Sequence, residues 1–314
     1  MGTTTGSEME QAIHRQPAEL RRLLDDTTSV ERVAEQLRGR SVCLVGTGTS
    51  WHAANHAAWL LRDAQTGAQP LQAIDGAAYG LWREFDAVLI FSHRNTKRYT
   101  TEIRAEAEAA GLPVFVIGAR GVGADIETVE PERSAAFTVS HLGALMRAAQ
   151  LATLLGAGLG DLGAIPDAVE RVVERDGDFE APERLVEFTG AGPNQWTAAE
   201  GALKARETSY VATEGLSVEQ LLHGPAVALD ERDALVVLDG GGPAAERVQA
   251  VANAAAAAGV RVTTLEERGL GEALSIFPLT AGVQLIALRL AVGLGIDPDC
   301  FRQPAKPSWR EVPL

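Results

Sequence analysis

The sequence predicts an α/β protein with two tandem domains, each built on a parallel sheet flanked by helices. Short apolar runs alternate with helical stretches, and two of these runs end in a glycine-rich turn, at Gly46–Gly48 and at Gly190–Gly192. The apolar runs do not alternate with polar residues, which is typical of parallel strands covered on both faces. A chain of 314 residues suits two domains of about 150 residues, each a three-layer sandwich of the flavodoxin or Rossmann type.

The individual elements follow from the positions of the apolar runs. Amphipathic helices are expected over 8–26 and 29–37, the second capped by Ser29. The further expected strands are 41–45, 86–91, 114–117, 136–139, 185–189 and 234–238. The further expected helices are 51–61, 99–110, 141–155 and 195–210. The last stretch, 297–314, holds four prolines and is not expected to form a regular helix.

The second half of the chain repeats the first. The two glycine turns follow similar strands, and the strand at 87–91 with its turn has a counterpart at 234–242. We expect a boundary near 160–166. The predicted organisation is an N-terminal tail and helix over 1–27, a first domain over 28–163, a second domain over 164–298 and a C-terminal tail over 299–314.

The composition argues against several classes of protein. The formal net charge of −14 and the pI near 4.9 argue against a nucleic-acid-binding surface. No apolar run of the roughly 18 residues needed for a membrane span is evident, and the start does not resemble a signal peptide. Cys43 and Cys300 suggest neither a disulfide framework nor a metal site. We expect a cytoplasmic protein without a metal, an organic cofactor, a nucleic-acid partner or a membrane partner.

Lysine is rare in this chain. Of the 28 basic residues, 25 are Arg and three are Lys, namely Lys97, Lys204 and Lys306. A lysine amine can lose its proton, whereas a guanidinium stays charged. The three lysines therefore indicate positions that need an amine. The alternative is that Lys rather than Arg stands at these three positions by chance.

Lys204 belongs to the first of these places. Glu200, Lys204 and Glu207 are spaced i, i+4 and i+7 in an expected helix, which puts them on one face. The simpler interpretation is a solvated stripe of ion pairs. The functional interpretation is a carboxylate base beside an amine whose charge tunes it.

Two further segments carry single reactive side chains. His223 precedes Gly-Pro at an expected turn, where an imidazole either shuttles protons or serves a structural role. Lys306 lies between Pro304 and Pro307, either as a surface charge or as an amine presented to a carbonyl.

Two loops of the first expected domain follow strands at the same end of the sheet. Residues 47–50 offer hydroxyls and backbone N–H groups at a helix N-terminus, and residues 92–98 carry several cations. We expect the two loops to converge on an anion, with a basic surface loop as the alternative. The candidate anion-binding residues are Thr47, Gly48, Thr49, Ser50, Ser92, His93, Arg94, Asn95 and Lys97.

Together these segments resemble the sugar isomerase (SIS) family, and in particular the isomerase half of glucosamine-6-phosphate synthases, which consists of two SIS domains. The resemblance covers nearly the whole chain. Its most specific part runs from Glu200-Gly201-Ala202-Leu203-Lys204 to His223-Gly224-Pro225, and Ala305-Lys306 matches the family's C-terminal Ala-Lys.

The resemblance implies a role for each candidate. Glu207 is implied as the base that moves a proton between C1 and C2, supported by Lys204 and Glu200. His223 is implied to assist ring opening from the neighbouring subunit of a homodimer, and Lys306 to form a Schiff base. Ala305 and the first-domain loops are implied to bind the substrate and its phosphate, with Ser50, Thr49 and Ser92 at matching positions.

The chain departs from the family in two respects. The family's phosphate loop, Ser-x-Ser-Gly-x-Thr, is here Ser92-His93-Arg94-Asn95-Thr96-Lys97, so longer cationic side chains replace small ones. Asn tolerates the positive φ that the lost Gly provides. The glutaminase half has no counterpart in this sequence, so ammonia is expected to be exchanged with solution.

These observations predict an enzyme that transfers a proton between C1 and C2 of an open-chain sugar phosphate or amino-sugar phosphate. Isomerisation, deamination and deglycation all remain open. The alternative is a non-catalytic SIS protein that binds or senses a sugar phosphate. A nicotinamide-dependent dehydrogenase is disfavoured, because Trp51 stands where the dinucleotide fingerprint requires a small residue.

Overall fold

The computed structural model of the chain describes residues 6–175, 177–300 and 308. These residues form two units, each with its own parallel sheet. The β1–β5 unit consists of residues 18–132 and 139–163, and the β6–β9 unit of residues 6–17, 133–138 and 164–300. Helix α1 (Glu8–Leu24) contributes residues to both units.

The β1–β5 unit has a five-stranded sheet in the order β2-β1-β3-β4-β5. All four strand pairs are parallel. The strands are β1 (Ser41–Gly46), β2 (Gly67–Gln72), β3 (Ala87–Phe91), β4 (Val114–Gly118) and β5 (Ile126–Glu127). The helical elements are α2 (Thr28–Leu37), α3 (Thr49–Leu60), α4 (Ala73–Tyr79), η1 (Leu81–Glu84), α5 (Arg98–Ala109) and α6 (Val139–Leu154).

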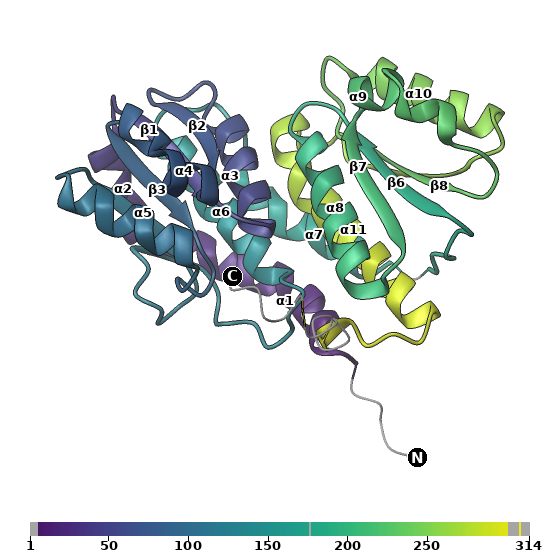
Figure 1. Ribbon diagram of the computed structural model, residues 1–314, viewed down its shortest axis with the longest axis horizontal. Coiled ribbons are helices and arrows are strands. Elements are labelled where there is room, and N and C mark those ends of the chain that lie inside the picture. Colours follow the sequence, from purple (N-terminus) through teal and green to yellow (C-terminus); the bar gives the residue numbers. More distant parts are fainter. Residues whose placement is uncertain (1–5, 176, 301–307, 309–314) are drawn as a thin grey trace. The chain divides into compact units, whose positions relative to one another are not determined.

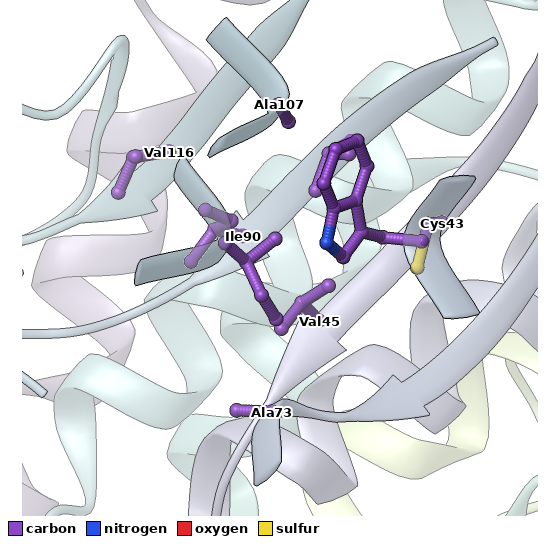
Figure 2. Close-up of a cluster of buried hydrophobic side chains, with 9 residues drawn as sticks. Cys43, Val45, Ala73, Ile90, Ala107 and Val116 are labelled. Atoms are coloured by element: carbon purple, nitrogen blue, oxygen red, sulfur yellow. The ribbon is translucent and has the colours of Figure 1, made fainter. Parts of the chain in front are cut away.

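Buried side chains on both faces of this sheet explain the uninterrupted apolar runs. On one face Cys43, Val45 and Ile90 pack with Trp82 of η1 and with apolar residues of α4 and α5 (Figure 2). Helices α3 and α6 pack against one another, and α3 also contacts β1. The two covered faces leave the carboxyl ends of the strands as the edge where side chains are free to form a site.

The β6–β9 unit has a four-stranded parallel sheet in the order β7-β6-β8-β9. Helices α8 and α11 lie on one face, and α9 and α10 lie on the other (Figure 1). The strands are β6 (Leu185–Gly190), β7 (Ala212–Ser217), β8 (Ala234–Asp239) and β9 (Arg261–Glu266). The helical elements are η2 (Leu162–Ala164), α7 (Ile165–Val173), α8 (Asn194–Ser209), α9 (Val218–Leu222), η3 (Pro225–Ala228), α10 (Ala245–Ala257), α11 (Glu272–Gly293) and η4 (Pro298–Cys300).

Three expectations from the sequence are wrong. Residues 136–138 are irregular and α6 begins at Val139, so no strand forms at 136–139. The N-cap of α2 is Thr27 rather than Ser29. The third wrong expectation is that no apolar stretch is long enough for a membrane span. Helix α11 has that length and composition, with a mean hydropathy of 1.6 over 18 residues. Since 83% of that window is buried, its apolar character serves packing within the protein.

Candidate functional site

Helix α8 holds Lys204 between two carboxylates. The Lys204 ammonium lies 2.6 Å from Glu207 Oε2 and 3.7 Å from Glu200 Oε1. Lys204 is 2% exposed and Glu200 is fully buried. The interpretation as a solvated ion-pair stripe is therefore wrong.

Close packing explains how α8 buries these charges. A methyl group built on Gly201 would lie 2.9 Å from Phe188 of β6 and 2.9 Å from Val283 of α11. Only glycine allows α8 to approach both elements this closely. Helix α8 is thus pressed between the sheet and α11, and its polar stripe is removed from water.

Glu207 is the member of the cluster that reaches solvent. Its side chain is 24% exposed, whereas Glu200 and Lys204 are inaccessible. A carboxylate in this setting can meet a substrate while a buried ammonium compensates its charge. The cluster has the geometry of one usable base with two supporting groups.

The C-terminal tail begins beside the end of α8. Segment η4 packs against α8 and α11. The Asp299 carboxylate accepts hydrogen bonds from the backbone N–H groups of Glu8 and Met9, at 2.7 and 2.8 Å. Burial, followed by the charge of Asp297, raises the pKa of Tyr210, the residue that ends α8. Ala305 and Lys306, the two candidates on the tail, lie outside the described residues.

His223 does not join the Lys204 cluster. It ends α9 on the opposite face of the sheet from α8, and its side chain is 78% exposed. The imidazole Nε2 lies 3.5 Å from Glu219, which also pairs with Arg247 at 2.8 Å. Val227, four residues further on, is 93% exposed. The His223 segment is thus a protruding surface feature of this chain.

The turn after β1 has the expected form of an anion site. Gly48 is the N-cap of α3 with a φ of 58°, and Gly46 is required because a methyl group there would lie 2.2 Å from the Ser50 carbonyl oxygen. Thr49 and Ser50 form the first turn of α3, whose backbone N–H groups favour an anion.

The loop after β3 follows the sequence expectation only in part. Asn95 has a φ of 51° and so takes a left-handed turn, as expected for an Asn at the position where the resemblance implies Gly. His93 is half-buried, and its Nε2 accepts a hydrogen bond from the Glu132 backbone N–H at 3.0 Å. Arg94 donates to the Glu132 carbonyl oxygen at 3.1 Å, while Lys97 is exposed as the N-cap of α5. Asn95 Nδ2 donates to the Val122 carbonyl oxygen at 3.3 Å, so three of the expected anion ligands are engaged with the protein itself.

In the part of the chain that the structure describes, four buried carboxylates were missed in the sequence, namely Glu132, Glu187, Asp233 and Asp239. Glu187 stands in the apolar strand β6 and is 1% exposed, and its position inside an apolar run is a signal that could have revealed it. Burial, with a contribution from Glu214, raises the pKa of Glu187 to about 8. Glu132 is 3% exposed and lies in a polar connection, where the sequence gives no signal. No cluster of three or more metal-ligating side chains occurs in the described ranges.

No protein-family model matches the chain. Among curated proteins, the isomerizing glutamine–fructose-6-phosphate aminotransferase of Sphingobium yanoikuyae is 31% identical over 142 residues, which cover 40% of this chain and 91% of that relative. The chain belongs to the sugar isomerase (SIS) family. A second aminotransferase of the same name, from Methanothermobacter thermautotrophicus, is 25% identical over 95% of this chain.

Solved SIS structures share the fold over nearly the whole chain. Tagatose-6-phosphate ketose/aldose isomerase from Escherichia coli has a TM-score of 0.78 and 19% identity, covering 95% of this chain and 97% of that one. Glucosamine-6-phosphate deaminase from Thermotoga maritima has a TM-score of 0.72 and 19% identity, covering 95% and 98%. This SIS chain spans 24%, 31% and 56% of the length of three curated aminotransferases.

Proposed function

We propose that this SIS chain is an enzyme that moves a proton between C1 and C2 of an open-chain sugar phosphate or amino-sugar phosphate. The observation that carries the proposal is the buried Lys204 ammonium, 2.6 Å from a Glu207 carboxylate that remains accessible. A surface ion pair has no need of such burial. A base that must stay ionised beside a substrate does need a nearby compensating charge.

In the proposed reaction, Glu207 removes a proton from one carbon and returns it to its neighbour. An enediol or enolamine forms between the two transfers, and Lys204 with Glu200 holds the carboxylate in place. Lys306 condenses with the ketose carbonyl and releases water, and the imine makes the adjacent C–H more acidic. Cys300 lies beside the end of α8, and the six residues from there to Lys306 span at most roughly 20 Å. That reach supports a tail lysine acting near Glu207.

We further propose that the two units are two tandem SIS domains, one for the anion and one for proton transfer. The exposed His223 segment supports its use in the site of a neighbouring subunit, and therefore a homodimer. The reaction needs no metal or organic cofactor in this scheme. A cytoplasmic location remains part of the proposal.

The altered loop at 92–97 favours a second candidate, a SIS protein that binds a sugar phosphate without turning it over. His93 and Arg94 are engaged with Glu132, so the anion contacts of this chain differ from the family's pattern. The proposed base is compatible with isomerase, deaminase and deglycase activities alike. The chemical readout must therefore separate them.

The test is a panel of hexose, amino-hexose and glycated-amine phosphates, read out by ketose formation, ammonia release and release of the free amine. In parallel, sodium borohydride reduces any imine to a stable secondary amine, which peptide mass spectrometry locates. We expect turnover of at least one substrate and an adduct on Lys306 that is absent in Lys306→Arg. Binding of a sugar phosphate without turnover or adduct would support the non-catalytic candidate.

A further inference from the structure

We propose that His93 and Glu132 form a clamp that positions the 92–97 loop for anion binding, and that neither is an anion ligand. The inference rests on the proposed anion site of the β1–β5 unit. It assigns His93 and Arg94, which stand in the expected anion loop, to an internal support of that loop. The residues concerned all lie in one unit and within the described part of the chain.

A pair of hydrogen bonds joins the loop to the segment before α6. The Glu132 N–H donates to His93 Nε2 at 3.0 Å, and Arg94 donates to the Glu132 carbonyl oxygen at 3.1 Å. One residue thus engages two consecutive loop residues through its backbone. The loop is also held from the residue after β4, since the Ala119 N–H donates to the His93 carbonyl oxygen at 2.9 Å.

The protonation state of His93 also supports the clamp. Burial, followed by the nearby Arg94 charge, lowers the pKa of His93 to about 4. The imidazole is therefore neutral at pH 7, and because Nε2 accepts a bond, the proton is assigned to Nδ1. A neutral acceptor is what the Glu132 N–H requires. A cationic imidazole at this position could not accept that bond.

Glu132 also connects the clamp to the other half of the proposed anion site. The Glu132 carboxylate accepts a bond from the Ser140 N–H at 2.9 Å, at the start of α6. The next residue, His141, lies with its ring centroid 5.8 Å from that of His56 in α3. Helix α3 begins at the anion turn with Thr49. Glu132 therefore contacts the loop directly and reaches the turn through two packed helices.

Among the other expected anion ligands of the loop, Lys97 is exposed, whereas Ser92 is buried at 5% exposed. Asn95 closes the turn between them, with its N–H donating to the Ser92 carbonyl oxygen at 3.2 Å. If the clamp is released, this turn loses its support from the 132 segment. The anion affinity then falls although no anion ligand has been removed.

The experiment measures sulfate and sugar-phosphate binding by titration calorimetry for the wild type, His93→Leu, His93→Gln and His93→Asn. Leu removes the acceptor, Gln places a carbonyl oxygen near the Nε2 position, and Asn is too short to do so. We expect affinity to fall about ten-fold in the Leu and Asn variants and to be retained within two-fold in the Gln variant. Having both the Leu and the Asn variant guards against one of them failing to fold.

Thr66→Val is the matched control. It removes a buried hydrogen bond to the Leu37 carbonyl oxygen in the same unit, at the opposite end of the sheet. We expect it to lower the Tm without changing anion affinity. Wild-type affinity in the Leu and Asn variants would overturn the clamp alone. Failure of the wild type to bind sulfate and every sugar phosphate tested would overturn the anion site as well.

Discussion

The two units end their central strands in similar turns but use the space beside those turns differently. In the β1–β5 unit the turn after β1 and the loop after β3 carry hydroxyls and cations, including Ser50 and Lys97. In the β6–β9 unit the corresponding turns follow β6 and β8, and both pack closely against the Glu272 carboxylate. A methyl group built on Gly192 would lie 2.7 Å from Glu272 Oε1, and one on Gly242 would lie 2.4 Å from Glu272 Cδ.

Under the proposed function, this difference implies that strand order alone does not make an anion site. Both sheets reverse strand order between their central strands, where ligands bind in open α/β folds. The β6–β9 unit places an internal carboxylate there and keeps its buried charge cluster on α8. We therefore expect separable effects. Changes in the β1–β5 unit should alter anion affinity, and changes in the β6–β9 unit should alter turnover or stability.

The largest expected effect comes from Glu207→Gln. The amide cannot accept the substrate proton, so kcat should fall by about 100- to 10,000-fold, the usual contribution of a general base. The affinity for the sugar phosphate should stay within about three-fold, because the proposed anion site lies in the other unit. Steady-state kinetics and calorimetry measure the two quantities. Glu246→Gln, an exposed change in the same unit, is the control. An unchanged kcat with a raised KM would break the proposed division between the units.

The second prediction is that a buried residue of the β6–β9 unit makes the free energy of unfolding depend on pH, whereas its counterpart in the β1–β5 unit does not. Glu187 lies three residues before Gly190, and its counterpart three residues before Gly46 is Cys43. Burial raises the pKa of Glu187 from 4.5 to about 8 and that of Cys43 from 9.0 to about 12. Only Glu187 therefore changes its charge within the physiological range.

The sign of the Glu187 effect follows from proton binding. Between about pH 4.5 and 8 the folded state keeps a proton that the unfolded state has released. The free energy of unfolding should therefore fall as pH rises through this window, by at most about 1.4 kcal/mol per pH unit. Urea unfolding of Glu187→Gln should lose this slope, whereas Cys43→Ala should lower stability equally at pH 5 and pH 8. A slope that persists in the Gln variant would contradict a neutral Glu187.

Most of the fold was predictable from the sequence because the central strands are buried on both faces. Strands such as β1 and β3 were placed within a residue or two, since their apolar runs are uninterrupted. Edge strands such as β2 and β7 were not predicted, because they are partly exposed and contain polar residues or Pro70. The expected strand at 136–139 failed because a short apolar run does not distinguish a strand from a connection entering a helix.

The candidate site was predictable where local spacing decides the outcome. Glu200, Lys204 and Glu207 share a helix face by periodicity, and the structure places them together. The role of His93 was not predictable, because its partner Glu132 is remote in sequence and contributes backbone atoms. Backbone donors carry no residue signature, so only the fold reveals such a contact.

A smaller effect tests the anion side of the comparison. Lys97→Ala should raise KM for a phosphorylated substrate by about ten-fold, because a charge-assisted hydrogen bond contributes roughly 1.5–3 kcal/mol and solvent screens an exposed amine. KM for the dephosphorylated sugar should not change. Arg98→Ala is the matched control, since it removes one exposed cation from the adjacent position, where the guanidinium pairs with Glu102 at 2.8 Å. An equal rise in KM in the two variants would show that the loop attracts the phosphate only by its general positive charge and that Lys97 is not a specific ligand.

The smallest expected effect comes from Glu272→Ala, which empties the position against Gly192 and Gly242. The carboxylate lies in the first turn of α11, where it also favours the helix N-terminus. We expect a loss of about 1 kcal/mol in the free energy of unfolding, with Glu272→Gln losing less because it keeps the shape. Thermal and urea unfolding measure this loss, while sulfate affinity should remain at its wild-type value. A change in sulfate affinity would show that the Glu272 turns and the proposed anion site act on each other, and the contrast between the two units would then describe one coupled site.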